Sequence, residues 1–373
     1  MGEFLFVAIA LGPIFISLIA RIAGYRLKQT YLLVTMLVLT SFSALRFESG
    51  QDWGAYENFF KQIDLQRGIF DYLNYRSYSV SQFEVGFYLL NYAIRIINGN
   101  YYHVLAVCSI VSGISVYIFF KQIKEYTDFA IVSYIGYSYL LLGFAQSRQS
   151  LGLAFFLFGL TFYLRRDKSV IYFFAISLIG VAFQYSVAIY LLIGLTAYLI
   201  TRFVWVGRIA IIIFLLLAIF IKNSNTNIFQ FFMIIAFNET IIDKVNIYET
   251  DLSQGGILNL LYSVILLFNA FLIYRKSIYE VEFRIQFLFN LAATALYLSF
   301  LIVFVLPGFY ALYSRVYALA SILMPVVFYF IGRRKNNLTL HFFTAINYAA
   351  LIISYFKIFY LFYDEYIPYN VWV

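Results

Sequence analysis

One stretch of the sequence, residues 46–84, gathers side chains that can bind anions or move protons. Charge is scarce in the whole chain, because 63% of the residues are hydrophobic and only 12% are charged. A long polar segment between two apolar ones is therefore unlike a passive connection, and we interpret it as the mouth of an active site. The side chains of this kind that we single out are Arg46, Glu48, Asp52, Tyr56, Glu57, Arg67, Asp71, Arg76 and Glu84.

The elements that must position this segment are transmembrane helices. The 373-residue chain has a mean hydropathy of +0.84, and its apolar runs reach the ~20 residues that a helix needs to cross a bilayer. They lack the two-residue alternation of membrane strands. The predicted fold class is all-α: a polytopic integral membrane protein with a single membrane domain, residues 1–373. The first run follows Glu3 and has no small-residue cleavage signature, so we expect a span and no removable signal peptide.

The positive-inside rule orients these spans, because most basic clusters then lie in cytoplasmic connections and both termini lie outside. Two larger periplasmic loops remain, about 46–100 and about 222–254, each expected to carry an interfacial helix. Residues 85–97 are short for a span, and a crossing there would move every later basic cluster outside, so we expect them at the interface. The predicted spans, about 12 in number, are 4–20, 30–45, 101–120, 127–146, 149–164, 169–184, 186–201, 203–221, 255–274, 285–306, 314–331 and 339–356.

Three arginines depart from this charge bias, because Arg46, Arg148 and Arg315 lie at the outer ends of spans beside polar or aromatic residues. Snorkelling to the interface is the simpler explanation for a single arginine. Three arginines together with the carboxylates of the first loop favour an anion site. Their planar guanidinium groups suit a phosphate or pyrophosphate, which they can bind through two parallel hydrogen bonds.

Other classes of site find little support in the sequence. Cys108 is the single cysteine, which excludes an internal disulfide and a thiolate metal cluster. His103 and His341 lie far apart without a zinc-binding spacing, so we expect neither metal nor cofactor. The net charge of +8 is explained by the membrane topology, and we expect no nucleic-acid partner.

Polar motifs follow one another in a definite order along the chain. They are Arg46, Gly50, Asp52, Trp53 and Tyr56 in the first loop, then Glu84-Val85-Gly86-Phe87, Ser147-Arg148-Gln149 before a span ending in Arg165-Arg166, and Ser314-Arg315. Their order resembles the EpsG-like and Wzy-type O-antigen (polysaccharide) polymerases, over nearly the whole chain. Where that family often has a histidine after a phenylalanine, this chain has Phe183-Gln184, whose amide can hydrogen-bond a sugar.

The resemblance implies an enzyme of the bacterial inner membrane that joins undecaprenyl-pyrophosphate-linked oligosaccharide repeat units at the periplasmic face. An acceptor hydroxyl attacks the anomeric carbon of the donor, and negative charge grows on the pyrophosphate that leaves. The arginines would hold that pyrophosphate, and Asp52 or Glu84 would take the acceptor proton or orient the sugar. The implied catalytic residues are Asp52, Glu84, Arg148 and Arg315, and the implied substrate-binding residues are Arg46, Tyr56, Gln149, Gln184 and Tyr313.

Alternatives stay open at this point. Asp52 can simply pair with an arginine. A flippase for lipid-linked oligosaccharides has a similar number of spans, although it needs charges at several depths, and an O-antigen ligase uses the same donor with another acceptor. The implied partners are the lipid-linked oligosaccharide, membrane lipid, a chain-length regulator and a flippase.

Overall fold

The computed structural model describes the helical part of the chain and a few residues near its carboxyl terminus. These are residues 2–25, 27–50, 52–65, 83–122, 127–165, 170–203, 283–305, 310–332, 349, 352–353, 355–356, 359 and 370–371. Within them the chain is mostly helical, and its two strands have two residues each, which confirms the predicted helical character. The chain divides into two compact units, residues 1–191 with 335–373 and residues 192–334, and each is described by itself.

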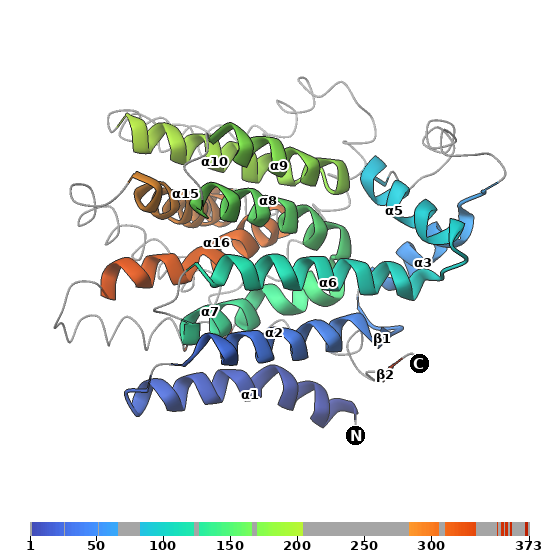
Figure 1. Ribbon diagram of the computed structural model, residues 1–373, viewed down its shortest axis with the longest axis horizontal. Helices are drawn as coiled ribbons and strands as arrows, with labels where there is room; N and C mark the ends of the chain where they lie inside the picture. Colours follow the sequence, from blue (N-terminus) through green and yellow to red (C-terminus); the bar gives the residue numbers. More distant parts are fainter. Residues whose placement is uncertain are drawn as a thin grey trace. The chain divides into compact units, whose positions relative to one another are not determined.

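The first unit is a bundle of roughly antiparallel helices that run alternately in opposite directions (Figure 1). Helix α8 packs against α9 and α6, α2 packs against α6, and α1 packs against α7. Helix α10 begins in this unit and ends in the second. The bundle helices are α1 (Gly2–Ile22), α2 (Gln29–Ala44), α6 (Tyr101–Phe120), α7 (Thr127–Ser133), η2 (Tyr134–Ala145), α8 (Ser147–Arg165), α9 (Val170–Phe183) and α10 (Val187–Arg202).

Two short helices, α3 (Trp53–Gln62) and α5 (Val85–Ile96), lie at the end of the bundle where α2 ends and α6 begins (Figure 1). Helix α5 has 12 residues, which at about 1.5 Å per residue gives a length of roughly 18 Å. The hydrocarbon core of a bilayer is about 30 Å thick. Its length therefore agrees with an interfacial helix, and the absence of a crossing at 85–97 stays a prediction.

An arginine joins the two short helices. The Nη1 atom of Arg95, in the last turn of α5, donates hydrogen bonds to the carbonyl oxygens of Phe60 and Lys61, at 3.0 and 2.9 Å. These carbonyls belong to the last turn of α3, where carbonyls lack the regular helical donor four residues on, and that of Phe60 also accepts from the backbone N–H of Ile63 at 3.4 Å. A cation at the carboxyl end of a helix also complements its dipole. Arg95 therefore holds α3 and α5 together as one outer layer.

Helices α8 and α9 approach closely through glycines. A Cβ atom on Gly180 would lie 2.5 Å from the carbonyl oxygen of Gly152, and one on Gly159 would lie 2.7 Å from that of Phe173. Small residues at such crossings let two helix backbones approach in membrane proteins. The tight contact brings the beginning of α8 next to the turn that follows α9.

The segment before α8 is a π-helix, η2, which covers Tyr134–Ala145 and continues directly from α7. π-helical hydrogen bonds are rare in proteins, occur mostly as single turns and are frequent at functional sites. The 127–146 span predicted from hydropathy thus contains two kinds of helix. The π-helix ends at the residue before Gln146, so it delivers the chain to Ser147 and Arg148.

Three basic residues of the first unit lie at one end of the bundle. Lys28 precedes α2, Lys121 follows α6, and Arg165 ends α8. All three helix ends lie at the end of the bundle opposite α3 and α5 (Figure 1). This distribution agrees with the positive-inside rule, with α3 and α5 on the outer side.

The second unit contains α15 (Phe283–Val305) and α16 (Tyr310–Gly332), which pack against each other. Asn290 on α15 donates a hydrogen bond of 2.9 Å to the hydroxyl of Thr201 at the end of α10. Pro325 lies inside α16. The spans predicted at 203–221 and 255–274, most of the one at 339–356, and the loop at 222–254 lie outside the described residues.

Two helices of the described part, Tyr101–Phe120 and Phe283–Ile302, are long and apolar enough to cross a membrane by length and composition. Several apolar helices, including 29–44, 170–183 and 187–202, are shorter. These helices support a membrane-embedded protein. They do not establish the predicted number of about 12 spans, nor a single domain, and both stay predictions.

Candidate active site

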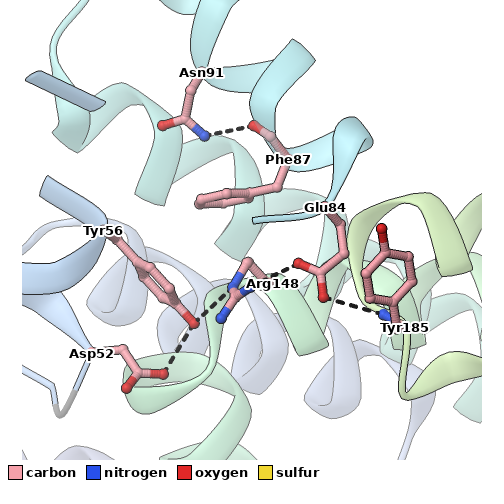
Figure 2. Close-up of polar contacts among 7 residues, drawn as sticks. All are labelled: Asp52, Tyr56, Glu84, Phe87, Asn91, Arg148 and Tyr185. Atoms are coloured by element: carbon pink, nitrogen blue, oxygen red, sulfur yellow. Dashed lines mark hydrogen bonds and ion pairs between the residues drawn. The ribbon is translucent and has the colours of Figure 1, made fainter. Parts of the chain in front are cut away.

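Four predicted site residues form one continuous chain of polar contacts where α3, α5 and the start of α8 meet (Figure 2). The Tyr56 hydroxyl donates to Oδ2 of Asp52 at 3.0 Å and accepts from Nε of Arg148 at 3.2 Å. Nη1 of Arg148 donates to Oε2 of Glu84 at 2.7 Å, as an ion pair. Side chains from the starts of three separate helices, α3, α5 and α8, are thus brought together.

Helix starts position all of these side chains. Asp52 precedes α3 and Glu84 precedes α5, each as the N-cap residue, and Arg148 is the second residue of α8. Neither carboxylate makes the side-chain hydrogen bond that usually caps a helix. Both carboxylates are therefore directed to Tyr56 and Arg148 and not to the backbone of their own helices.

Tyr56 is the centre of the chain of contacts. Its side chain is buried, at 4% exposure, among Phe59, Phe83 and Phe87. Burial raises the pKa of the Tyr56 phenol, Asp52 raises it further, and Arg148 opposes the shift. A phenol with a raised pKa stays protonated, which agrees with its donation to Asp52. Tyr56 is therefore a neutral group that joins an anion to a cation.

Arg148 is held in one orientation by its surroundings. The guanidinium carbon lies 5.1 Å from the ring centroid of Tyr56 and 4.6 Å from that of Phe83. Stacking on rings and hydrogen bonds at Nε and Nη1 fix the plane of the guanidinium group. Its side chain keeps 20% exposure, and Nη2 makes no hydrogen bond with the described residues. Arg148 thus presents one edge that a further acceptor can use.

Both oxygens of Glu84 accept hydrogen bonds from the protein. Oε2 accepts from Arg148, and Oε1 accepts from the backbone N–H of Tyr185 at 3.3 Å, in the turn between α9 and α10 (Figure 2). The side chain of Glu84 is 4% exposed. This geometry suits a carboxylate that holds Arg148 in place, and it suits Asp52 better than Glu84 as the group that receives a proton.

Arg46 lies next to this chain of contacts and is held differently. It is 2% exposed, and its Nη2 donates to the hydroxyl of Ser147 at 2.8 Å while Nη1 donates to that of Ser43 at 3.2 Å. Its guanidinium carbon lies 5.3 Å from the ring centroid of Phe144. Ser147 directly precedes Arg148, so the Arg46 guanidinium group is bound at the same helix start that carries Arg148.

The other predicted site residues lie apart from this chain of contacts. Gln149 is buried and donates to the hydroxyl of Tyr190 at 2.7 Å, which links α8 to α10. Gln184 is 7% exposed in the turn after α9, beside Tyr185. Tyr313 is buried and stacks on Tyr317, with ring centroids 5.5 Å apart.

Arg315 is half-buried on α16. Tyr313 and Arg315 belong to the second unit, so their part in a common site stays a prediction. Residues Arg67, Asp71 and Arg76 lie outside the described residues.

Three residues contribute to the site without having been predicted as site residues: Ser43, Ser147 and Tyr185. Ser43 and Ser147 hold Arg46, and the Ser43 hydroxyl donates to the carbonyl of Gly143 at 2.6 Å. Isolated serines in apolar helices carry no functional signal by themselves. Tyr185 acts through its backbone N–H, which any residue except proline possesses. Ser147 alone had a signal, as the neighbour of Arg148 in the third motif.

No group of three or more His, Cys, Asp or Glu side chains within the described ranges lies close enough to share a metal ion. The contacts described above offer an oriented guanidinium group, a neutral phenol and two carboxylates. The expectation that the protein needs neither metal nor cofactor stays a prediction.

The helical membrane fold and the arginine–carboxylate site are found in a chain that matches a known family along most of its length. The model of the EpsG family covers residues 29–371. The protein therefore belongs to the EpsG family, which confirms the resemblance of its motifs. Membership indicates a polysaccharide polymerase-like function in a membrane-embedded protein. No curated protein and no solved structure matches the chain.

Proposed function

We propose that the protein polymerises undecaprenyl-pyrophosphate-linked oligosaccharide repeat units by glycosyl transfer at the periplasmic face of the bacterial inner membrane. Membership of the EpsG family supports the polymerase class. The observation that carries the proposal further is the state of Arg148, which is oriented by Tyr56 and Glu84 and whose Nη2 makes no hydrogen bond with the described part of the chain. A pyrophosphate oxygen is such an acceptor.

The reaction needs a group that stabilises the leaving pyrophosphate and a group that receives the acceptor proton. The acceptor hydroxyl forms a bond to the anomeric carbon of the donor sugar, and the bond from that carbon to the pyrophosphate oxygen breaks with its electron pair. Arg148 stabilises the negative charge that grows on this oxygen. Asp52 takes the hydroxyl proton, and Tyr56 keeps Asp52 oriented through a 3.0 Å hydrogen bond.

Arginine suits the first role because it stays charged at any physiological pH and binds two oxygens at once. Arg315 is proposed as the second cation of the pyrophosphate site, together with Tyr313 beside it. Arg46, Gln149 and Gln184 are proposed to contact the sugars or to support the residues that do so. The lipid-linked oligosaccharide is the proposed partner, along with a flippase that supplies it and a regulator of chain length.

Polymer formation in cells tests the proposal. Arg148→Ala and Arg315→Ala should each abolish the polymer ladder on a gel while the protein remains in the membrane. Arg148→Lys should restore only part of it, because an ammonium group cannot form two parallel hydrogen bonds to the pyrophosphate. A normal ladder from either alanine variant would remove that arginine from the proposed site.

Asp52→Asn separates a polymerase from a flippase. Loss of polymerisation leaves glycan units on the outer side, so lipopolysaccharide capped with a single unit should persist. Loss of a flippase leaves no unit outside, so both the polymer and the single-unit band should disappear. A core-only pattern in cells with normal levels of the variant, rescued by an added flippase, would contradict the polymerase assignment.

A further inference from the structure

Three aromatic side chains form a partly exposed cluster beside the candidate active site. Phe47 and Tyr102 stack with ring centroids 5.2 Å apart and an interplanar angle of 12°. Trp53 lies 5.2 Å from Tyr102 and 6.4 Å from Phe47, measured between centroids. All three side chains are neither buried nor fully exposed. We call Phe47, Trp53 and Tyr102 the aromatic cluster.

Two residues of the aromatic cluster directly follow residues of the candidate active site: Phe47 follows Arg46, and Trp53 follows Asp52. Strand β1 (Arg46–Phe47) pairs with β2 (Asn370–Val371), and successive side chains of a strand point to opposite faces. Arg46 accordingly lies buried against Ser147, while Phe47 packs on Tyr102. Trp53 directly follows Asp52 at the start of α3. The rings are therefore held next to the proposed acid–base residue.

The residue after Phe47 carries a carboxylate on a strained backbone. Glu48 has a φ of 46°, in the left-handed region that non-glycine residues rarely adopt. Its side chain is exposed, and it makes no hydrogen bond or ion pair with any described residue. It directly follows Phe47 in the chain. A second carboxylate, Glu57 on α3, pairs with Lys61 at 3.0 Å. Backbone strain of this kind persists at binding and catalytic sites.

We propose that the aromatic cluster and Glu48 bind one sugar ring of the glycan next to the transfer site. This inference rests on the proposed function and assigns a saccharide to residues outside the Arg148 contacts. The apolar C–H face of a sugar can pack on the electron-rich faces of aromatic rings, which are rigid and lose little entropy on binding. The Glu48 carboxylate can accept hydrogen bonds from the sugar hydroxyls.

The aromatic belt of membrane interfaces is the competing explanation for such rings. A belt residue needs only lipid headgroups beside it, so it gives no reason for an exposed carboxylate in a strained conformation. The two explanations also predict different measurements. A sugar site binds a saccharide saturably, whereas a belt residue affects membrane insertion and does not bind a soluble sugar.

Tryptophan fluorescence of the purified full-length protein tests the inference. The other tryptophans, Trp205 and Trp372, are replaced by phenylalanine so that Trp53 reports alone. The probe is the oligosaccharide released by mild acid from the polymer of cells that carry this protein. A saturable change in Trp53 fluorescence is expected. A protein that is folded in detergent and shows no saturable change would overturn the inference.

Variants connect this binding to the individual residues. Tyr102→Ala should weaken binding of the oligosaccharide about three- to tenfold, the loss of one aromatic contact. Glu48→Asn should also weaken it, while keeping a residue type that tolerates the left-handed conformation. Tyr172→Ala is the matched control, because Tyr172 is 50% exposed at the start of α9. Equal affinities for Glu48→Asn, Tyr102→Ala and the control would overturn the inference.

Polymer length gives a readout that distinguishes this inference from the proposed function. A sugar site beside the transfer site should raise the KM for the acceptor and shorten the polymer, with little change in kcat. If the wild type makes polymer and Tyr102→Ala makes polymer of the same length and KM, the sugar site is wrong and the polymerase remains. If the wild type binds the oligosaccharide but never elongates lipid-linked units, the proposed function is wrong instead.

Discussion

The ion pair between Arg148 and Glu84 predicts that two substitutions together are less damaging to stability than one alone. Arg148→Ala leaves the Glu84 carboxylate, which is 4% exposed, with the Tyr185 backbone N–H as its one remaining donor among the described residues. Glu84→Gln keeps the size of the side chain and removes its charge. We therefore expect the Arg148→Ala, Glu84→Gln double variant to be more stable than Arg148→Ala.

The magnitude follows from the burial of the pair. Breaking a buried ion pair by removing one partner costs about 3–5 kcal/mol, mostly for the charge left behind. Arg148 keeps 20% exposure, which screens the pair and puts the expected cost at the lower end, about 3 kcal/mol. Glu84→Gln as a second change should recover about 1–2 kcal/mol of that cost, because a neutral amide loses less on burial than a carboxylate.

Thermal unfolding of the purified protein in detergent measures the four corners of this cycle: wild type, both single variants and the double variant. Polymer formation is measured in parallel, and the double variant should stay inactive, because the guanidinium group is still missing. Equal stability of Arg148→Ala and the double variant would refute the coupling. Recovered polymer in the double variant would show that Arg148 only supports the fold.

Three further predictions concern other parts of the first unit. Tyr56→Phe keeps the ring but loses the hydroxyl that orients Asp52, so polymer yield should fall about tenfold at unchanged protein level. Full yield would show that Asp52 does not need the hydrogen bond from Tyr56. Because burial raises the pKa of Tyr56 above the ordinary value of about 10, its phenol stays protonated throughout the physiological pH range. The wild type and Tyr56→Phe should therefore show activity–pH profiles of the same shape. An inflection that is present in the wild type and lost in the variant would show that Tyr56 titrates. Gly180→Ala should lower the free energy of unfolding by about 1–3 kcal/mol, because the added Cβ overpacks the contact between α8 and α9. Gly12→Ala is the control, because nothing lies within 4 Å of its added Cβ. Equal melting temperatures of the two variants would argue against the close helix contact. Arg95→Ala removes two hydrogen bonds to the end of α3 and should lower stability by about 1–2 kcal/mol, which hydrogen exchange in α3 would detect and unchanged protection would disprove.

The positions of several helices could be predicted closely from the sequence. The helix predicted at 101–120 is α6 with the same bounds, and the span predicted at 30–45 is α2, Gln29–Ala44. The physical reason is that a chain inside a bilayer must satisfy its backbone hydrogen bonds within one segment, so a long apolar run has little choice except a helix. The interruption of the 127–146 run by a π-helix has no such signature in the residue types.

Several residues of the site could be predicted from the sequence, but which side chain each of them contacts could not. Scarce charge at the outer ends of spans selected Asp52, Glu84 and Arg148, and the structure brings these three together. Which carboxylate pairs directly with Arg148 depends on how helix starts meet in space. Glu84 does so across 64 positions of sequence, whereas Asp52 is reached through Tyr56.

Arg46 shows the same limit. It was expected at the outer end of a span, where it would help to hold a pyrophosphate, and the contacts described for it include two serine hydroxyls and an aromatic ring. Single hydroxyls in apolar helices are too common to be recognised as ligands of an arginine before the packing is known.

The long separations within the site also bear on the order in which it forms during synthesis. Arg148 follows Glu84 by 64 positions, and Tyr185 follows Glu84 by 101. At about 5–20 residues per second, Glu84 leaves the ribosome roughly 3–13 s before Arg148. The rings of Tyr56, Phe59, Phe83, Phe87 and Tyr101, which all precede Tyr102 in the chain, can pack during that interval. The outer layer of the protein can thus assemble as an apolar platform first, and its carboxylates stay hydrated until α8 arrives with the arginine.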